Sequence, residues 1–167
     1  MIQIREASPQ DAPGVARVHV QSWQETYKGI VPDSYVAALS VPKREAFWKS
    51  FLAESKDKAL FVAVSGDDIV GFANCGPTRE LEMPFQAELY AIYLLQSHQG
   101  RGIGKQLMET VTTWLRARGY GSMMLWVLQD NPTLNFYKHC GGQIVAAKQV
   151  EIGGVELDEV AVGWSMI

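Results

Sequence analysis

The residues best suited to chemistry form a glycine-rich segment, Gln-Gly-Arg-Gly-Ile-Gly-Lys, at positions 99–105. Its three alternating glycines let the backbone turn tightly and let a ligand approach the N–H groups closely. The segment opens an amphipathic helical pattern, and the first turn of a helix offers unpaired N–H groups at a positive dipole end. Arg101 and Lys105 are cations in a turn where acids are favoured. The segment therefore predicts a phosphate-binding site.

Two other glycine-loop motifs fit this segment less well. A P-loop requires Ser or Thr after the lysine, whereas Gln106 follows Lys105. A dinucleotide-binding fingerprint has the spacing GxGxxG, whereas the glycines here run GxGxG. The alternative that stays open is structural: a tight strand-to-helix turn without a ligand.

A sheet with helices packed on it is expected to position this segment. Strands are predicted at about residues 2–5, 60–64, 69–73, 88–95 and 123–128, and on both sides of Gly153-Gly154. Helices are predicted from Ser8 to Gly29, over 31–39, around 47–52, from Ile103 to a stop at Gly119, and from Asn131-Pro132 to Gly141-Gly142. This order of elements is typical of a mixed α/β or α+β sheet.

Length and composition are those of a folded domain. The 167 residues are 47% hydrophobic and contain no repeat or linker, so one domain over 1–167 is expected. The net charge of −3, without a block of like charge, argues against nucleic-acid binding. No apolar stretch approaches the ~20 residues that span a bilayer, and no secretory signal pattern is present. Cys75 and Cys140 lack metal-site spacing, so we expect a reduced, cytoplasmic protein without a metal.

The glycine segment and its setting resemble the acetyl-CoA motif of the GNAT superfamily of N-acetyltransferases. The resemblance rests on Gln99-x-x-Gly102-x-Gly104 after the strand sequence Glu-Leu-Tyr-Ala-Ile-Tyr-Leu-Leu, and it extends to the order of elements and the closing hairpin. It implies a mostly antiparallel central sheet with a parallel strand pair at the acetyl-CoA site and helices on both faces. It also implies direct acetyl transfer from acetyl-CoA to a primary amine, in a ternary complex and without a metal.

The contacts with acetyl-CoA carry over by resemblance. Backbone N–H groups of 100–105 would hold the pyrophosphate, and Ile92, Tyr93 and Leu94 would pair with the pantetheine. A bulge near Leu94 would aim a backbone N–H at the thioester carbonyl as an oxyanion donor. The implied cofactor-binding residues are Ile92, Tyr93, Leu94, Gln99, Gly100, Arg101, Gly102, Ile103, Gly104, Lys105 and Asn131. Asn131 lies six residues before Tyr137, whereas the family usually has seven, which leaves its contact open.

Two further residues match positions that move protons in the family. Glu88 matches a general base, and Tyr137 matches the acid that protonates the leaving thiolate. In a regular strand, alternation would place Glu88, Tyr90, Ile92 and Leu94 on one face. The structural alternatives are a Glu88 that ends a strand in solvent and a Tyr137 that packs on the sheet.

The acceptor is the least defined part of the prediction. Aromatic and acidic residues near the first helices suit a cationic amine, although such aromatics are often core residues. The candidates are Trp23, Glu25, Tyr27, Tyr35 and Trp48. A small-molecule or peptide amine is expected, and a homodimer stays open because dimers are common in the family. A non-catalytic acetyl-CoA-binding module and a protein-interaction scaffold are the alternatives, since fold alone does not decide function.

Overall fold

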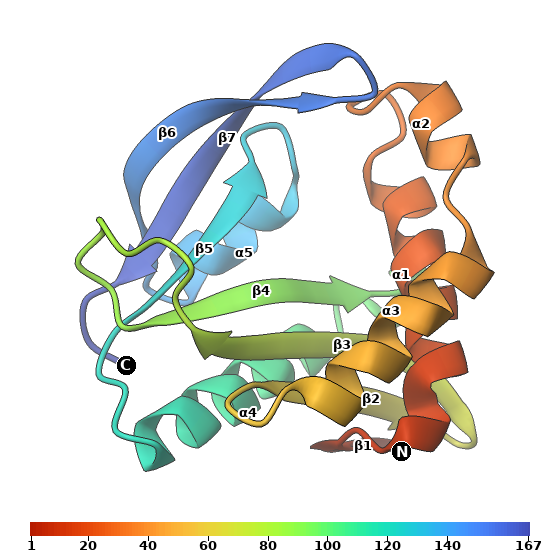
Figure 1. The fold of residues 1–167 in the computed structure, drawn as a ribbon, viewed down its shortest axis with the longest axis horizontal. Coiled ribbons are helices and arrows are strands. Elements are labelled where there is room, and N and C mark those ends of the chain that lie inside the picture. The colour runs from red at the N-terminus through yellow and green to blue at the C-terminus, as the bar shows by residue number, and fades with distance from the viewer.

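The computed structural model describes residues 1–167 and contains one seven-stranded sheet with helices on both faces (Figure 1). The strands are β1 (Ile2–Glu6), β2 (Ala59–Ser65), β3 (Asp68–Pro77), β4 (Ala87–Leu94), β5 (Met123–Leu128), β6 (Gln143–Ile152) and β7 (Val155–Trp164). The helices are α1 (Ala12–Thr26), α2 (Asp33–Ala37), α3 (Val41–Glu54), α4 (Ile103–Ala117) and α5 (Thr133–His139), with short 3-10 turns at Pro9–Asp11 and Gln96–His98. This order of elements confirms the predicted one.

The sheet is mixed, with strand order β1-β2-β3-β4-β5-β7-β6. Every neighbouring pair is antiparallel except β4 and β5, which are parallel. The predicted fold class, a mostly antiparallel sheet with one parallel pair, is therefore confirmed. The parallel pair sits at the centre of the sheet, where the two halves of the molecule meet.

Local sequence explains several of the element boundaries. Gly119 follows α4 with a φ of 86°, a left-handed conformation that terminates helices and that glycine adopts without a steric penalty. The side-chain oxygen of Asn131 accepts a hydrogen bond from the Thr133 N–H at 2.9 Å, so Asn131 caps the start of α5 as predicted. Gly153 and Gly154 have φ of 62° and 82° and form the two-residue turn between β6 and β7.

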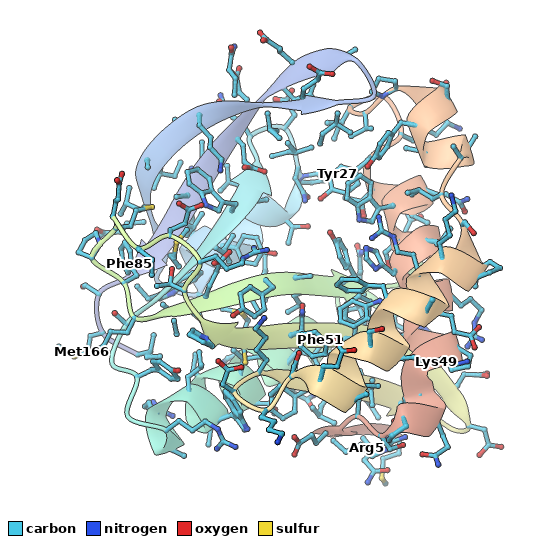
Figure 2. The ribbon with its side chains drawn as sticks, viewed as in Figure 1. Arg5, Tyr27, Lys49, Phe51, Phe85 and Met166 are labelled. Carbon is cyan, nitrogen blue, oxygen red and sulfur yellow. The ribbon has the colours of Figure 1, made fainter.

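Hydrophobic residues pack on both faces of the sheet. On one face, α4 buries Leu107, Val111 and Leu115 against the strands. On the other face, α1 and α3 contribute Val15, Val18 and Trp48, and these pack with Phe72 of β3. Figure 2 shows Phe51 of α3 directed toward the same region. These two layers hold β4 rigidly between them, which fixes the strand that carries the predicted site.

A β-bulge interrupts β4 at Tyr90. Leu89 lies opposite Cys75 and Ala91 lies opposite Asn74, so Tyr90 is an extra residue in β4. The bulge predicted near Leu94 is therefore wrong in position. The predicted shared face is also wrong, because Ile92 and Leu94 pack with the α4 core, whereas the Arg79 guanidinium, which pairs with Glu88, stacks on the Tyr90 ring.

The β6–β7 hairpin reaches across to α2 (Figure 1). A Cβ at Gly153 would lie 3.0 Å from the Tyr35 side chain and 3.3 Å from that of Pro32, so the hairpin tip contacts this segment closely. Tyr27 lies beneath this arch (Figure 2) and packs in a small cluster that includes Val31 and Leu128. No helix of the chain has the length and apolar character needed to cross a bilayer.

Candidate functional site

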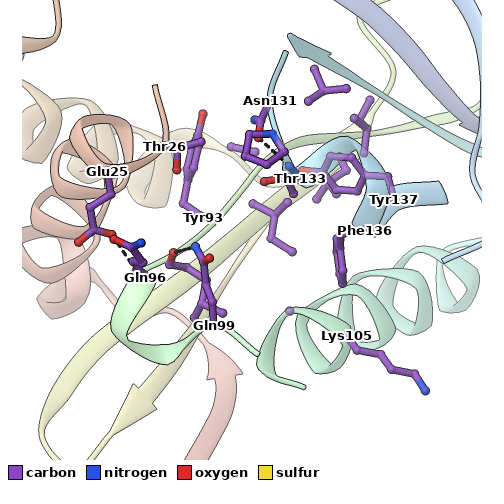
Figure 3. Close-up of a pocket in the computed structure, with 18 of the residues that line it drawn as sticks. Glu25, Thr26, Tyr93, Gln96, Gln99, Lys105, Asn131, Thr133, Phe136 and Tyr137 are labelled. Carbon is purple, nitrogen blue, oxygen red and sulfur yellow. Dashed lines mark hydrogen bonds between the residues drawn. The ribbon is translucent and has the colours of Figure 1, made fainter. Parts of the chain in front are cut away.

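The central feature of the site is a cleft between β4 and β5. The two strands pair only at Ala87 with Met123 and at Glu88 with Met124, although both strands continue beyond these residues. They then diverge, as Figure 1 shows, and leave a cavity of about 520 Å³. Its walls come from β4, β5, α5, the end of α1 and the start of α4 (Figure 3). The glycine-rich segment 99–105 thus lies at the border of this cavity.

Backbone groups of β4 are available along one wall of this cleft. The Leu95 N–H donates to the Val70 carbonyl at 2.9 Å. In an antiparallel ladder, residues alternate between facing the partner strand and facing away from it. Ile92 and Leu94 therefore direct their N–H and C=O groups away from β3, toward the cleft, while the backbone of Tyr93 faces β3. The Gln99 side chain donates to the Leu94 carbonyl at 3.0 Å, which leaves the Leu94 N–H and both groups of Ile92 for a ligand.

The start of α4 forms one end of the cleft. Gly100 and Gly102 have φ of 74° and 79°, and no atom lies within 4 Å of a Cβ built at either position. Gly104 is closer packed, since its Cβ would lie 3.3 Å from the Phe136 ring. Gly100, Gly102, Gly104 and Lys105 line the cleft. The first helical amides have no partner within the helix, so this end suits an anion.

The two cations of the segment do not point into the cleft. Lys105 extends along the outer surface of α4 (Figure 3), and its Nζ lies 4.0 Å from an oxygen of Glu109. Arg101 is exposed, and neither it nor Ile103 lines the cleft. Ile103 instead buries its side chain in the core under α4. The anion site is therefore formed mainly by backbone rather than by cationic side chains.

Helix α5 supplies the opposite wall. Asn131 is buried, and besides capping α5 its Nδ2 donates to the Tyr27 hydroxyl at 3.2 Å. Tyr137 is 5% exposed and lines the cleft. Its hydroxyl makes no hydrogen bond within the chain and is not fully enclosed, so it faces the cavity. A tyrosine is protonated at neutral pH, since its usual pKa is about 10, and burial raises the pKa of Tyr137 further.

Glu88 is buried and paired. It is 1% exposed, and Arg79 donates to it from the backbone N–H at 2.9 Å, from Nε at 3.2 Å and from the terminal guanidinium at 2.6 Å. Glu88 lines neither the cleft nor the neighbouring cavity, whereas Arg79 lines the latter. The structural alternative, a Glu88 that ends a strand in solvent, is wrong. Arg79 was not anticipated, because nothing in the spacing of residues 79 and 88 indicates an ion pair.

A second cavity of about 440 Å³ adjoins the cleft. Tyr27, Tyr90, Tyr93, Trp126 and Val127 line both, so the two spaces meet at an aromatic wall. The second cavity differs from the cleft in its charged side chains. These are Arg79, Glu80, Lys148 and Glu159. Burial raises the pKa of Glu159 above its usual value, although the nearby Lys148 ammonium opposes this.

The predicted acceptor residues are distributed unevenly over these spaces. Trp23 and Tyr27 line the second cavity. Glu25 lines the cleft, where its carboxylate accepts a hydrogen bond from the Gln96 N–H at 2.8 Å (Figure 3). Tyr35 lines neither space and contacts the hairpin tip. Trp48 is a core residue, 1% exposed, whose Nε1 donates to His19 at 3.2 Å.

Comparison with known proteins agrees with this geometry. The model of the acetyltransferase (GNAT) family matches residues 20–141. The N-acetyltransferase YuaI of Bacillus subtilis is 39% identical over 165 residues, which are 98% of this chain and 93% of that protein. The spermidine N(1)-acetyltransferase of Thermoplasma acidophilum is 27% identical over 86% of this chain and 89% of its own length.

A solved structure has the same fold. The PaiA N-acetyltransferase of Thermoplasma acidophilum, in complex with coenzyme A, superimposes with a TM-score of 0.75 at 22% identity, over 95% of this chain and 98% of that one.

Proposed function

The chain belongs to the GNAT family of acetyltransferases, and we propose that it transfers the acetyl group of acetyl-CoA to a primary amine by direct attack in a ternary complex. The observation that carries this proposal is the divergence of β4 and β5, which leaves unpaired β4 backbone beside the start of α4. A ligand that combines an extended amide chain with a diphosphate matches these two features at once.

The chain fits acetyl-CoA through its backbone. The bare amides of α4, together with the open Gly100 and Gly102, suit the diphosphate. The free edge of β4 at Ile92 and Leu94 suits the pantetheine, because an extended amide chain can pair there as an additional strand. The Tyr93 side chain forms part of the cleft wall. Asn131 also lines the cleft, and its hydrogen bond to the Tyr27 hydroxyl links α5 to the segment after α1. When bound, acetyl-CoA supplies an activated acetyl thioester.

Backbone amides stabilise the charge that develops on the thioester oxygen. The Leu94 N–H is the proposed oxyanion donor, and the Ile92 N–H points into the same cleft. Oxyanion donors of this kind are worth about 3–4 kcal/mol in other enzymes. Because β4 is held between two packed layers, these donors need no rearrangement during the reaction.

Two side chains are proposed to move protons. Tyr137 donates to the departing thiolate, a role supported by its position at the cleft and by its hydroxyl, which has no hydrogen-bond partner within the chain. Glu88 accepts a proton from the amine, directly or through a water. A lysine-type ammonium has a pKa near 10.4, so its neutralisation at pH 7 costs about 4–5 kcal/mol. For Glu88 to act as the base, the Arg79 guanidinium must move aside, which its 64% exposed side chain allows.

Release of free CoA thiol from acetyl-CoA, measured over a panel of amines, tests this proposal. We expect slow release by the protein alone and acceleration by some primary amines. Tight binding of acetyl-CoA without turnover would instead support a non-catalytic binding module. Absence of binding would support an interaction scaffold and overturn the proposed function.

A further inference from the structure

The second cavity contains an ammonium group held by three side chains. The Nζ of Lys148 lies 3.7 Å from a carboxylate oxygen of Glu159, 3.8 Å from one of Glu80 and 4.0 Å from the centre of the Trp126 ring. Two carboxylates and an aromatic face are the groups that bind ammonium ions in proteins. We refer to Glu80, Glu159 and Trp126 as the ammonium cage.

The cage does not depend on Lys148 for its shape. The Trp126 indole N–H donates to Glu80 at 3.0 Å, which joins the loop before β4 to β5. Glu159 is fixed on β7, opposite Leu128 of β5. Lys148 enters from the edge strand β6 and is 45% exposed. It forms no hydrogen bond with either carboxylate, and both of its ion-pair distances exceed 3.5 Å. Lys148 is thus a loosely held occupant.

The charges around the cage favour a further cation. Arg79 and Lys148 face three acids, Glu80, Glu88 and Glu159, which leaves one negative charge in formal excess. Arg79 is already committed to Glu88. If Lys148 left for solvent, the two carboxylates of the cage would have no cation beside them, and Glu80 would keep only its hydrogen bond from Trp126. Exposed ion pairs and exposed cation–π contacts contribute only about 0–1 kcal/mol each, so displacement of Lys148 by another ammonium is inexpensive.

The cage adjoins the cleft that contains the proposed reacting centre. Tyr90, Tyr93 and Trp126 line both cavities, and Trp126 is also the aromatic wall of the cage. An amine that approaches the β4 edge past Tyr90 and Tyr93 therefore extends its other end toward Trp126. That end meets aromatic faces and carboxylates rather than a neutral surface.

We propose that the ammonium cage binds a second, non-reacting ammonium group of the acceptor, so that the protein prefers diamines and polyamines to monoamines of the same length. Lys148 occupies the cage in the absence of the acceptor and leaves it when the acceptor binds. This inference rests on the proposed acetyl transfer and specifies its acceptor.

The experiment compares 1,4-diaminobutane, 1,6-diaminohexane and spermidine with the n-alkylamines of matching length. Thiol release gives kcat/KM, and calorimetry gives the affinity of each amine for the acetyl-CoA-free protein. For the wild-type chain we expect a preference of about tenfold for the diamine, because its second ammonium gains ion pairs and a cation–π contact that the monoamine lacks. Glu159→Gln and Glu80→Gln should lower kcat/KM for the diamine much more than for the monoamine, so that the preference falls. The amide oxygen introduced by Glu80→Gln can still accept from the Trp126 indole N–H.

Two further variants complete the design. Lys148→Met removes the competing ammonium and should raise diamine affinity severalfold. Glu156→Gln, at an exposed β7 position outside the cavity, is the matched control and should leave the preference unchanged.

The outcomes separate the two proposals. Equal use of diamine and monoamine by the wild type, or equal loss of both in the two glutamine variants, would overturn the cage. If no amine is acetylated, the proposed function fails, and the calorimetric preference then tests by itself whether the cage binds a second ammonium group. A diamine preference that Glu159→Gln abolishes supports it, and the absence of any preference overturns it.

Discussion

The cleft and the second cavity share one aromatic wall but recognise ligands by different means. The cleft presents backbone amides of β4 and α4, and its own cations point elsewhere. The second cavity presents charged side chains carried by the loop before β4 and by the strands β6 and β7. Backbone geometry is insensitive to most substitutions, whereas side-chain identity can change without altering the fold. The difference indicates that the donor site is fixed by the fold and the acceptor site by a few replaceable residues.

The largest expected effect tests the backbone character of the cleft. Gly104→Leu would direct a side chain against the Phe136 ring, which a Cβ alone would approach to 3.3 Å. We expect acetyl-CoA affinity to fall about 100-fold, which corresponds to nearly 3 kcal/mol. Calorimetric titration with acetyl-CoA measures this. Gly121→Ala, whose Cβ would make only an ordinary contact at 3.5 Å, is the control; equal affinity of the two variants would contradict the assignment.

The next effect concerns the acid at the end of the cleft. Tyr137→Phe should lower kcat by about tenfold to 100-fold, because general acid catalysis contributes on this scale. The KM for acetyl-CoA should change little, since the ring stays in place. Steady-state kinetics with Tyr120→Phe as a control separates this role from a general loss of stability. Unchanged kcat in Tyr137→Phe would remove the acid role.

The third prediction concerns Glu88, which pairs with Arg79 of the second cavity. Glu88→Gln should reduce kcat/KM about tenfold or more near neutral pH if Glu88 is the base. Arg79→Met distinguishes this from a positioning role, because it removes the guanidinium hydrogen bonds to the carboxylate and leaves Glu88 in place. Activity retained in Arg79→Met but lost in Glu88→Gln supports the base. Equal losses, with unchanged pH–rate profiles, would show that Glu88 serves only to orient Arg79.

The smallest expected effect concerns stability rather than activity, and it depends on His19, which packs behind the aromatic wall that the two cavities share. The His19 ring stacks on the Tyr93 ring, with 5.4 Å between the ring centroids. Burial and, to a smaller extent, the positive charge of Arg44 lower the pKa of His19 to about 3. An unfolded histidine titrates near 6.5, so the unfolded state binds more protons below that pH and stability falls as pH falls toward 3. Asp11, with a pKa lowered to about 2 chiefly by its hydrogen bonds with Arg5, loses its contribution only below about pH 4.

Denaturant unfolding between pH 6 and 5, compared between the wild type and His19→Asn, therefore tests His19. We expect the free energy of unfolding to fall by at most about 1.4 kcal/mol per pH unit in the wild type. His19→Asn keeps an acceptor for the Trp48 indole N–H and should show a flatter profile. Parallel profiles of the two proteins would mean that His19 is not the titrating group.

Features that depend on local sequence could be predicted. The helix stop at Gly119, the cap at Asn131 and the Gly153-Gly154 turn each follow from the preferences of one or two residues, and the structure contains all three. The glycine segment likewise indicated its own position between strand and helix. The element order then limited the sheet to few arrangements, which is why the fold class was correct.

Features that depend on register could not be predicted. One extra residue at Tyr90 separates Glu88 from the face of Ile92, and nothing in the sequence marks it. Trp126, Lys148 and Glu159 come together only because β5, β7 and β6 pair in a particular alignment. Glu80 lies on a loop, and its bond with Trp126 spans 46 positions. The acceptor side therefore required the tertiary structure.

The bulge at Tyr90 has a consequence for how the chain tolerates deletions. Because Leu89 and Ala91 occupy consecutive positions opposite β3, excision of Tyr90 would leave every other pairing in that ladder intact. A bulge bends the strand that contains it, so the shortened strand would run straighter and stay beside β5 for longer. A mutant lacking Tyr90 would therefore keep the β3–β4 ladder but have a narrower opening between β4 and β5. The extra residue at Tyr90 thus helps to keep β4 and β5 apart, so that a ligand can enter between them.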